Sequence, residues 1–321
     1  MSLRRLRPRL QAAVACAAFA CATAATATAG ARLDPAFQGA RDGAPVRAVV
    51  TFRGEGPPDA GELALLGGRG LDGRPFRALP MAIVEAPVGQ LRQLASVPQV
   101  RSIWHDRKLP RPAPGPASPA LPVSGGWSGR GIGVLLATPG ADPGDGVHRL
   151  APGAEVVGFR TGSGKSLSTA LGAFDHALEH QFEHNIRVLW NPLAVLDAPV
   201  RADPDHPLQV ALRALAERGV MVVVPQAVDA DGSAVPWALG TGPSRDGEAP
   251  PLCGVLALML EANPALDWRQ ARDILRHGGH PPMAAIDPDA AVRAALARAG
   301  STNPGGRGQA GRLTGFGAES Q

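Results

Sequence analysis

The chain of 321 residues is poor in cysteine, with only three. Two of them, Cys16 and Cys21, lie in an N-terminal segment that we expect to be removed, which leaves Cys253 alone. A single cysteine cannot form an internal disulfide, so the folded protein must be stabilised by its hydrophobic core. The length and a hydrophobic fraction of 45% suit an α/β core plus a smaller module and exclude a disordered chain.

The chain also lacks a basic surface outside its first residues. The formal net charge is +4 at pH 7, and four N-terminal arginines account for all of it. The remainder is near neutral, which excludes the basic footprint expected of a nucleic-acid-binding protein. The four residues are Arg4, Arg5, Arg7 and Arg9.

Long apolar runs are missing too, apart from Ala12 to Ala25, which is short for a membrane span. This run follows the arginines and precedes Ala27-Thr28-Ala29, an A-x-A cleavage pattern. That order is typical of a secretory signal peptide, here residues 1–29. We therefore expect a secreted or periplasmic protein without a membrane segment after signal cleavage.

Hydrophobic periodicity predicts a small module in the N-terminal third. After a linker over residues 30–45, residues 46–108 show a β-α-β-β-α-β order, which predicts an α+β, ferredoxin-like module. A proline-rich sequence over residues 109–125 follows. Neither a sheet nor a helix accommodates such a sequence, so it predicts a linker between two domains. The expected strands lie at 46–52, within 76–86 and at 100–104, and the expected helices at 59–66 and 88–96.

Residues 126–299 predict a larger α/β domain. Its short apolar runs lack inside/outside alternation and alternate with helical stretches, which favours a three-layer domain with a parallel sheet between helices. Residues 300–321 are glycine-rich and are expected to form a loose tail. The expected strands are 132–137, 155–159, 186–190 and 220–224, and the expected helices are 167–184, 208–218, 250–261, 267–276 and 289–298.

Several segments resemble subtilisin-like serine peptidases, the subtilases, in the order in which that family carries them. Residues 46–108 resemble the inhibitory propeptide, and the later segments resemble the strands and helices that carry the catalytic residues. The resemblance implies a subtilisin-like domain preceded by a propeptide-like module, in a family of serine endopeptidases. The segments are Val49 to Phe52, Leu79 to Val84, Leu91 to Ile103, Gly131 to Pro143, Ala151 to Val156, Asn185 to Leu193, Gly219 to Val228 and Pro250 to Leu266.

The resemblance also implies that the catalytic residues are replaced. The catalytic aspartate position falls on Thr138, the oxyanion asparagine on Val228 and the nucleophilic serine on Asp246. The histidine-bearing segment is expected to be deleted, because few residues separate Asp142 from Ala151. Serine peptidase chemistry needs a nucleophile, a base, a carboxylate and oxyanion donors together. We therefore expect a non-catalytic homologue without a cofactor that binds peptides or secreted peptidases.

Two alternatives remain open. One is a residual hydrolase that uses Ser244 with His148 as its base, or a metal on His176 and His180. The segment His176-Ala-Leu-Glu-His180 matches an H-x-x-E-H pattern of zinc peptidases, and His184 extends it by one turn. The apolar face of this helix lies on its other side, so we expect the histidines to face solvent. A catalytic zinc would need a cleft, which a solvated face does not provide. The other alternative is that residues 46–108 act as a peptidase inhibitor.

Two further motifs receive structural interpretations. Gly162-Ser-Gly-Lys-Ser166 resembles a phosphate loop but has Phe159 where the first glycine is required. We expect a turn there, with Ser166 or Ser168 capping the next helix. Cys253 lies among apolar helix residues and is expected to be buried and inert. The oligomeric state is left open.

Overall fold

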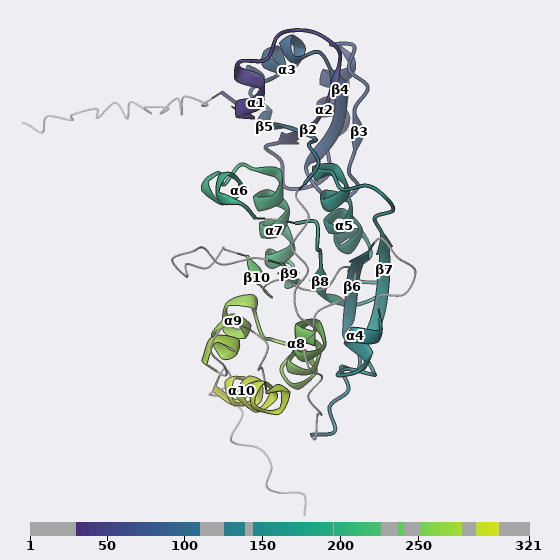
Figure 1. Ribbon diagram of the computed structural model, residues 1–321, viewed down its shortest axis with the longest axis vertical. Helices are drawn as coiled ribbons and strands as arrows, with labels where there is room; N and C mark the ends of the chain where they lie inside the picture. Colours follow the sequence, from purple (N-terminus) through teal and green to yellow (C-terminus); the bar gives the residue numbers. More distant parts are fainter. Residues whose placement is uncertain are drawn as a thin grey trace, which may run out of the picture.

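The computed structural model describes residues 30–109, 125–138, 144–194, 196–225, 237–240, 251–277 and 287–301. Figure 1 shows them as a stack of layers, in which helices lie above, between and below two sheets. None of the described helices is long and apolar enough to cross a membrane.

The first sheet belongs to the N-terminal part and has the strand order β1-β5-β2-β4-β3. The central strand β2 pairs antiparallel with both β4 and β5, which confirms the ferredoxin-like arrangement predicted for residues 46–108. The strands are β1 (Arg32–Leu33), β2 (Val46–Phe52), β3 (Arg74–Pro75), β4 (Met81–Ala86) and β5 (Val100–His105), and the helices are α1 (Pro35–Gln38), α2 (Ala60–Gly67) and α3 (Val88–Leu94).

Residues 30–45, predicted to be a linker, contribute to this sheet. Strand β1 pairs parallel with β5, and Phe37 of α1 is buried in the core that the module forms with α2 and α3. The sequence signal was weak, because β1 spans two residues and α1 four, too few for a periodicity to develop. The linker prediction is therefore corrected for residues 32–38.

The second sheet is entirely parallel and has the strand order β10-β9-β8-β6-β7. The strands are β6 (Gly133–Thr138), β7 (Glu155–Arg160), β8 (Ile186–Trp190), β9 (Met221–Val224) and β10 (Ala238–Gly240). The helices are α4 (Asp145–His148), α5 (Leu167–Glu179), α6 (Ala198–Ala202), α7 (Pro207–Glu217), α8 (Pro251–Ala262), α9 (Trp268–His277) and α10 (Pro288–Ser301).

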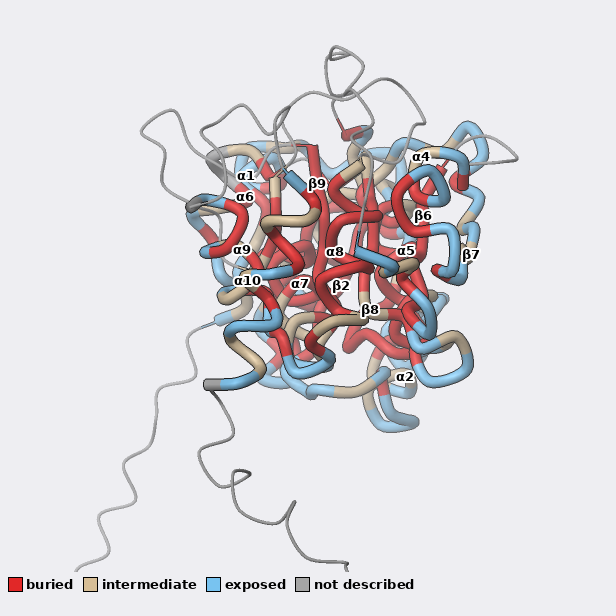
Figure 2. Tube along the Cα trace, turned by 90° about the horizontal axis from the view of Figure 1, so that it is seen from below, coloured by how far each residue is buried: buried red, intermediate tan, exposed pale blue. Residues whose placement is uncertain are grey.

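Helices cover both faces of this sheet, which confirms the predicted three-layer α/β class (Figure 1). Strand β6 shows why its residues read as a continuous apolar run: Leu135 packs toward α5 and α7, whereas Val134 and Leu136 pack toward α8. The buried positions are concentrated in the strands and in the inner sides of the helices, as Figure 2 shows.

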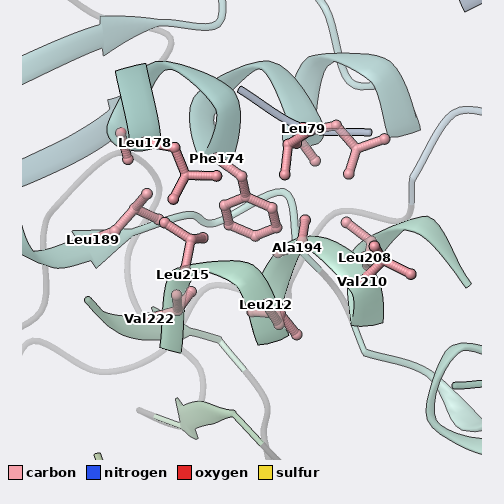
Figure 3. Close-up of a cluster of buried hydrophobic side chains, with 14 of the residues drawn as sticks. Leu79, Phe174, Leu178, Leu189, Ala194, Leu208, Val210, Leu212, Leu215 and Val222 are labelled. Atoms are coloured by element: carbon pink, nitrogen blue, oxygen red, sulfur yellow. The ribbon is translucent and has the colours of Figure 1, made fainter. Parts of the chain in front are cut away.

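The first sheet is also buried on both faces. Along β2, Val50 packs into the module's own core, whereas Val49 belongs to the cluster that contains α5 and α7. Leu79 and Met81 of the module join the same cluster. Figure 3 shows Leu79 close to Phe174 of α5, so the hydrophobic core continues from the module into the larger domain.

Candidate functional site

The carboxyl ends of the parallel strands meet at one edge of the second sheet, the edge at which α/β folds usually place their ligands. Strand β6 ends there at Thr138, which is 3% exposed. Its carbonyl oxygen accepts a hydrogen bond from the N–H of Thr161, which follows β7, at 3.0 Å. The residue at the resemblance's catalytic aspartate position is therefore a buried threonine with an uncharged side chain, and its backbone is bonded to the neighbouring strand end.

Strand β8 ends beside it in a tight turn. The fully buried Asn191 donates from Nδ2 to the carbonyl of Ala170 at 2.9 Å and accepts at Oδ1 from the N–H of Leu193 at 3.1 Å. Its backbone N–H donates to Val223 at 3.1 Å. These bonds use both ends of the Asn191 amide for the turn, so this side chain has a structural role at the strand end.

Several predicted site residues lie outside the described part of the chain. These are Asp142, Val228, Ser244 and Asp246. Their predicted roles therefore stay predictions. His148, the proposed base of a residual hydrolase, is exposed on α4.

Helix α4 occupies the connection between β6 and β7, where the resemblance places the histidine helix. It has only four residues, and Val147 and the nearby Leu150 pack against α8. A Cβ atom added to Gly254 of α8 would lie 2.9 Å from Leu150 Cβ and 3.2 Å from the Val147 carbonyl oxygen. The glycine therefore permits the close approach by which this short connection covers α8.

Cys253, next to Gly254, is fully buried as predicted. Burial raises the pKa of its thiol, so the reactive thiolate is disfavoured.

The start of α5 shows what the glycine-rich segment before it does. Ser166 is the N-cap, as predicted, and accepts from the N–H of Thr169 at 3.3 Å. The N–H of Ser168 donates to Asp106 at 2.7 Å, and the N–H of Leu167 donates to the carbonyl of Arg107 at 3.1 Å. The carboxylate of Asp106 thus occupies the place at which a phosphate would bind a helix N-terminus. The segment works as an internal anchor for the module.

A second anchor is the carboxylate of Asp175, in the middle of α5. It is 8% exposed and accepts three consecutive backbone N–H groups from the loop before β4, those of Arg77 (2.9 Å), Ala78 (2.8 Å) and Leu79 (2.9 Å). Charge-assisted hydrogen bonds of this kind fix geometry as well as adding energy. Sequence reasoning missed this residue, although a carboxylate four residues after Leu171 lies on the apolar helix face and needs partners.

A third contact involves His206, which is 1% exposed at the start of α7. Its ring lies 4.3 Å from the ring of Trp104 at the end of β5, and its Nδ1 accepts from the N–H of Leu208 at 3.2 Å. Burial, with a smaller contribution from the charge of Arg107, lowers the pKa of His206 to about 3. The imidazole is therefore neutral at ordinary pH, as its role as an acceptor requires.

The histidines predicted to face solvent are half-buried along the end of α5. The ring centroids of His176 and His180 lie 4.3 Å apart, and those of His180 and His184 lie 6.3 Å apart. The ring of His176 also lies 5.5 Å from that of Phe159 on β7. Burial, followed by the charge of His180, lowers the pKa of His176. The expectation of a solvated face therefore needs correction, because β7 covers part of it.

Comparisons with known proteins give a fold and leave the family open. No model of a protein family matches the chain, and no curated protein matches it. Among solved structures it is similar to fervidolysin from Fervidobacterium pennivorans, a keratinolytic enzyme related to subtilisin, with a TM-score of 0.52 and 13% identity over 82% of this chain. The match covers 63% of the fervidolysin chain.

A weaker match is the MycP3 protease from the type VII (ESX-3) secretion system, with a TM-score of 0.35 and 15% identity over 52% of this chain and 84% of that one. The similarity to fervidolysin supports a subtilisin-like fold.

Proposed function

We propose that this chain is an exported, non-catalytic protein with a subtilisin-like fold that acts by binding peptides or peptidases and keeps its N-terminal module attached. The observation that carries the proposal is Thr138, at the end of β6. A serine peptidase needs a carboxylate there to orient the histidine and to stabilise the imidazolium, and a neutral hydroxyl does neither.

The oxyanion position supports the same conclusion. The resemblance places that donor at Val228, whose side chain has no hydrogen to donate. The Asn191 amide is oriented by the strand end, because one Nδ2 hydrogen goes to the Ala170 carbonyl and Oδ1 accepts from Leu193. Loss of one oxyanion donor typically costs roughly 3 kcal/mol of transition-state stabilisation. The replaced positions Val228 and Asp246 are part of the proposal through the resemblance alone.

The expectation that the module stays attached rests on its buried face. Leu79, Met81 and Trp104 pack against α5 and α7, and the carboxylates of Asp106 and Asp175 bind across the junction. A module that inhibited peptidases in trans would need this face exposed. The structure therefore favours an internal role for the module over the inhibitor alternative.

Hydrolysis of casein by the chain beginning at Gly30 tests the loss of catalysis. We expect no hydrolysis above buffer, with or without a metal chelator, while a working subtilase in parallel digests the substrate. Hydrolysis that disappears in the Ser244→Ala variant would establish the residual serine hydrolase instead. Hydrolysis that disappears with chelator would point to the histidines of α5.

An inhibition assay with that working subtilase tests the other alternative, that residues 46–108 act as a peptidase inhibitor. Adding the intact chain in large excess is expected to leave the rate of peptide cleavage unchanged, because the face that an inhibitor would use is covered. A saturable fall in rate would show that the module acts on other peptidases.

A further inference from the structure

The end of α5 carries a repeated motif that the proposed function does not use. Residues 176–184 read His-Ala-Leu-Glu-His-Gln-Phe-Glu-His, so that two H-x-x-E-H units share His180. In the first unit, spacings of three and four residues place the side chains on one side of α5 and its C-cap. The second unit lies in the turns after α5, where the N–H of His184 donates to the carbonyl of His180 at 3.2 Å. The structure brings the ligand atoms of each unit within 4.8 Å of one another.

The second unit has the more complete arrangement. The carboxylate of Glu183 lies between two imidazoles, with Oε2 at 3.1 Å from His180 Nδ1 and Oε1 at 3.8 Å from His184 Nε2. Two ligand atoms on one tetrahedral zinc ion, each about 2.0–2.1 Å from the metal, are separated by roughly 3.3 Å. The distance from Glu183 to His180 already suits a shared ion, and the other ligand atoms of the unit, within 4.8 Å, must close by up to about 1.5 Å.

The other nitrogen of each ring faces a carboxylate as well. His184 Nδ1 lies 2.6 Å from Oε1 of Glu155 at the start of β7, and His180 Nε2 lies 3.8 Å from Oε2 of Glu179. Metal-ligating histidines commonly donate their second N–H to such a carboxylate, which fixes the tautomer and the ring orientation. Glu179 is held by Arg77 at 2.8 Å.

That ion pair also distinguishes the two units. In the first unit, His176-Glu179-His180, the carboxylate is engaged by Arg77 and would have to release it to bind a metal in full. In the second unit, Glu183 contacts the two histidines, and its side chain is 66% exposed, which leaves room for water as a further ligand. Imidazole and carboxylate together suit zinc and similar transition ions better than magnesium or calcium.

We propose that His180, Glu183 and His184 bind one divalent transition-metal ion, zinc by preference, with Glu155 and Glu179 positioning the two rings. The ion ties the turn after α5 to the start of β7 and so stabilises this corner of the parallel sheet. The site stands on its own and does not depend on whether the chain hydrolyses peptides.

Calorimetric titration with Zn²⁺ tests the site on the tag-free chain beginning at Gly30, in which Cys16 and Cys21 are absent. We expect one equivalent of Zn²⁺ to bind with a Kd of roughly 10 μM or tighter, and to raise the Tm by at least about 2 °C. Mg²⁺ at the same concentration is expected to leave the Tm unchanged.

Single substitutions locate the ion. His180→Gln, Glu183→Gln and His184→Gln are each expected to weaken Zn²⁺ binding at least tenfold, whereas His176→Gln and the exposed His148→Gln should stay within about threefold of the unsubstituted chain. The Tm of each variant without metal should match the unsubstituted chain, which separates lost ligands from lost folding.

Two results would overturn the proposal. Binding that never saturates near one equivalent, or that survives His180→Gln, would mean that zinc adheres to the surface without a defined site. Loss of binding in His176→Gln with retention in His184→Gln would contradict the assignment and favour the first unit.

Discussion

The carboxylate of Asp175 accepts three backbone N–H groups from a loop about a hundred residues earlier in the chain. Buried N–H groups that lose their acceptor keep the cost of desolvation, typically 1–3 kcal/mol each. A single side chain thus supports the loop that leads into β4, and its contribution is open to measurement.

Replacement of Asp175 by alanine is expected to lower the free energy of unfolding by about 3 kcal/mol, because all three donors are left unpaired. Asp175→Asn keeps the Oδ1 acceptor that serves Ala78 and Leu79, and should cost about 1 kcal/mol. Denaturant titration measures both. The exposed Asp72→Asn serves as the control, and an Asp175→Ala variant as stable as this control would contradict the role assigned to the carboxylate.

His206 makes stability depend on pH. Its folded pKa of about 3 lies below the ordinary value of 6.5, so between these values the unfolded chain binds a proton that the folded chain does not. Stability therefore falls as pH decreases through this window, by up to about 1.4 kcal/mol per pH unit from this group. Well above pH 6.5, where the imidazole is neutral in the unfolded chain as well, the group contributes no pH dependence.

The variant His206→Asn keeps a helix-capping acceptor and removes the titration. We expect the loss of unfolding free energy between pH 7 and pH 5 to shrink by about 2 kcal/mol relative to the unsubstituted chain. Unfolding titrations at the two pH values measure it, with the exposed His148→Asn as the matched control. An unchanged difference between the two pH values would show that His206 is already protonated or solvated in the folded state.

At the scale of elements, the contact between α4 and α8 explains how a four-residue helix can serve as the connection from β6 to β7. If the histidine-bearing helix is deleted, as predicted, other residues must cover α8. Val147 and Leu150 pack there. Their approach depends on Gly254, where a side chain would meet Leu150 at 2.9 Å.

Gly254→Ala is therefore expected to destabilise the protein by about 1–3 kcal/mol, despite alanine's higher helix propensity, because α4 must move away. Gly67→Ala at the end of α2 is the matched control, since an added Cβ there meets nothing within 4 Å. It should be neutral or slightly stabilising. Thermal unfolding compares the two, and a stabilising Gly254→Ala would show that α4 adapts without cost.

The sequence predicted regular elements well and the links between them poorly. The strand Ile186–Trp190 and the start of α5 at Leu167 agree with prediction, because apolar runs and a serine cap are local signals. Helix α5 ends at Glu179, before the predicted His184, because turns replace the last helical residues. Strand β1 and helix α4 are too short to produce a periodic pattern.

The candidate site was also predictable only in part. Position Thr138 could be identified from resemblance, whereas the partners of Asp106 and Asp175 could not, because each lies more than 60 residues away in the chain. Apolar periodicity predicts which face of α5 is buried, but it does not predict that residues of the N-terminal module pack against this helix. It also does not predict the half-burial of His176, whose ring lies beside Phe159 of β7.

At the scale of the whole molecule, the module and the larger domain share one hydrophobic core cluster. Leu79, Met81 and Val49 are buried against α5 and α7, and buried apolar side chains each contribute roughly 1.5–3 kcal/mol relative to exposure. Hydrogen bonds to Asp106 and Asp175 add specificity. The covalent connection between the two parts is therefore not required to hold them together.

A cut in the connection tests this conclusion. With the recognition sequence of an unrelated site-specific peptidase inserted within residues 110–124, the cleaved chain is expected to elute from a size-exclusion column as one species, and its fragments to separate only in denaturant. The same cleaved chain with Leu79→Asp should separate in native buffer, because a charge is then buried in the shared core. Leu296→Asp, at a 40% exposed position on α10, should leave the fragments together. Separation of the unsubstituted fragments in native buffer would contradict the attached module, because the face that packs on α5 and α7 would then be available to other peptidases.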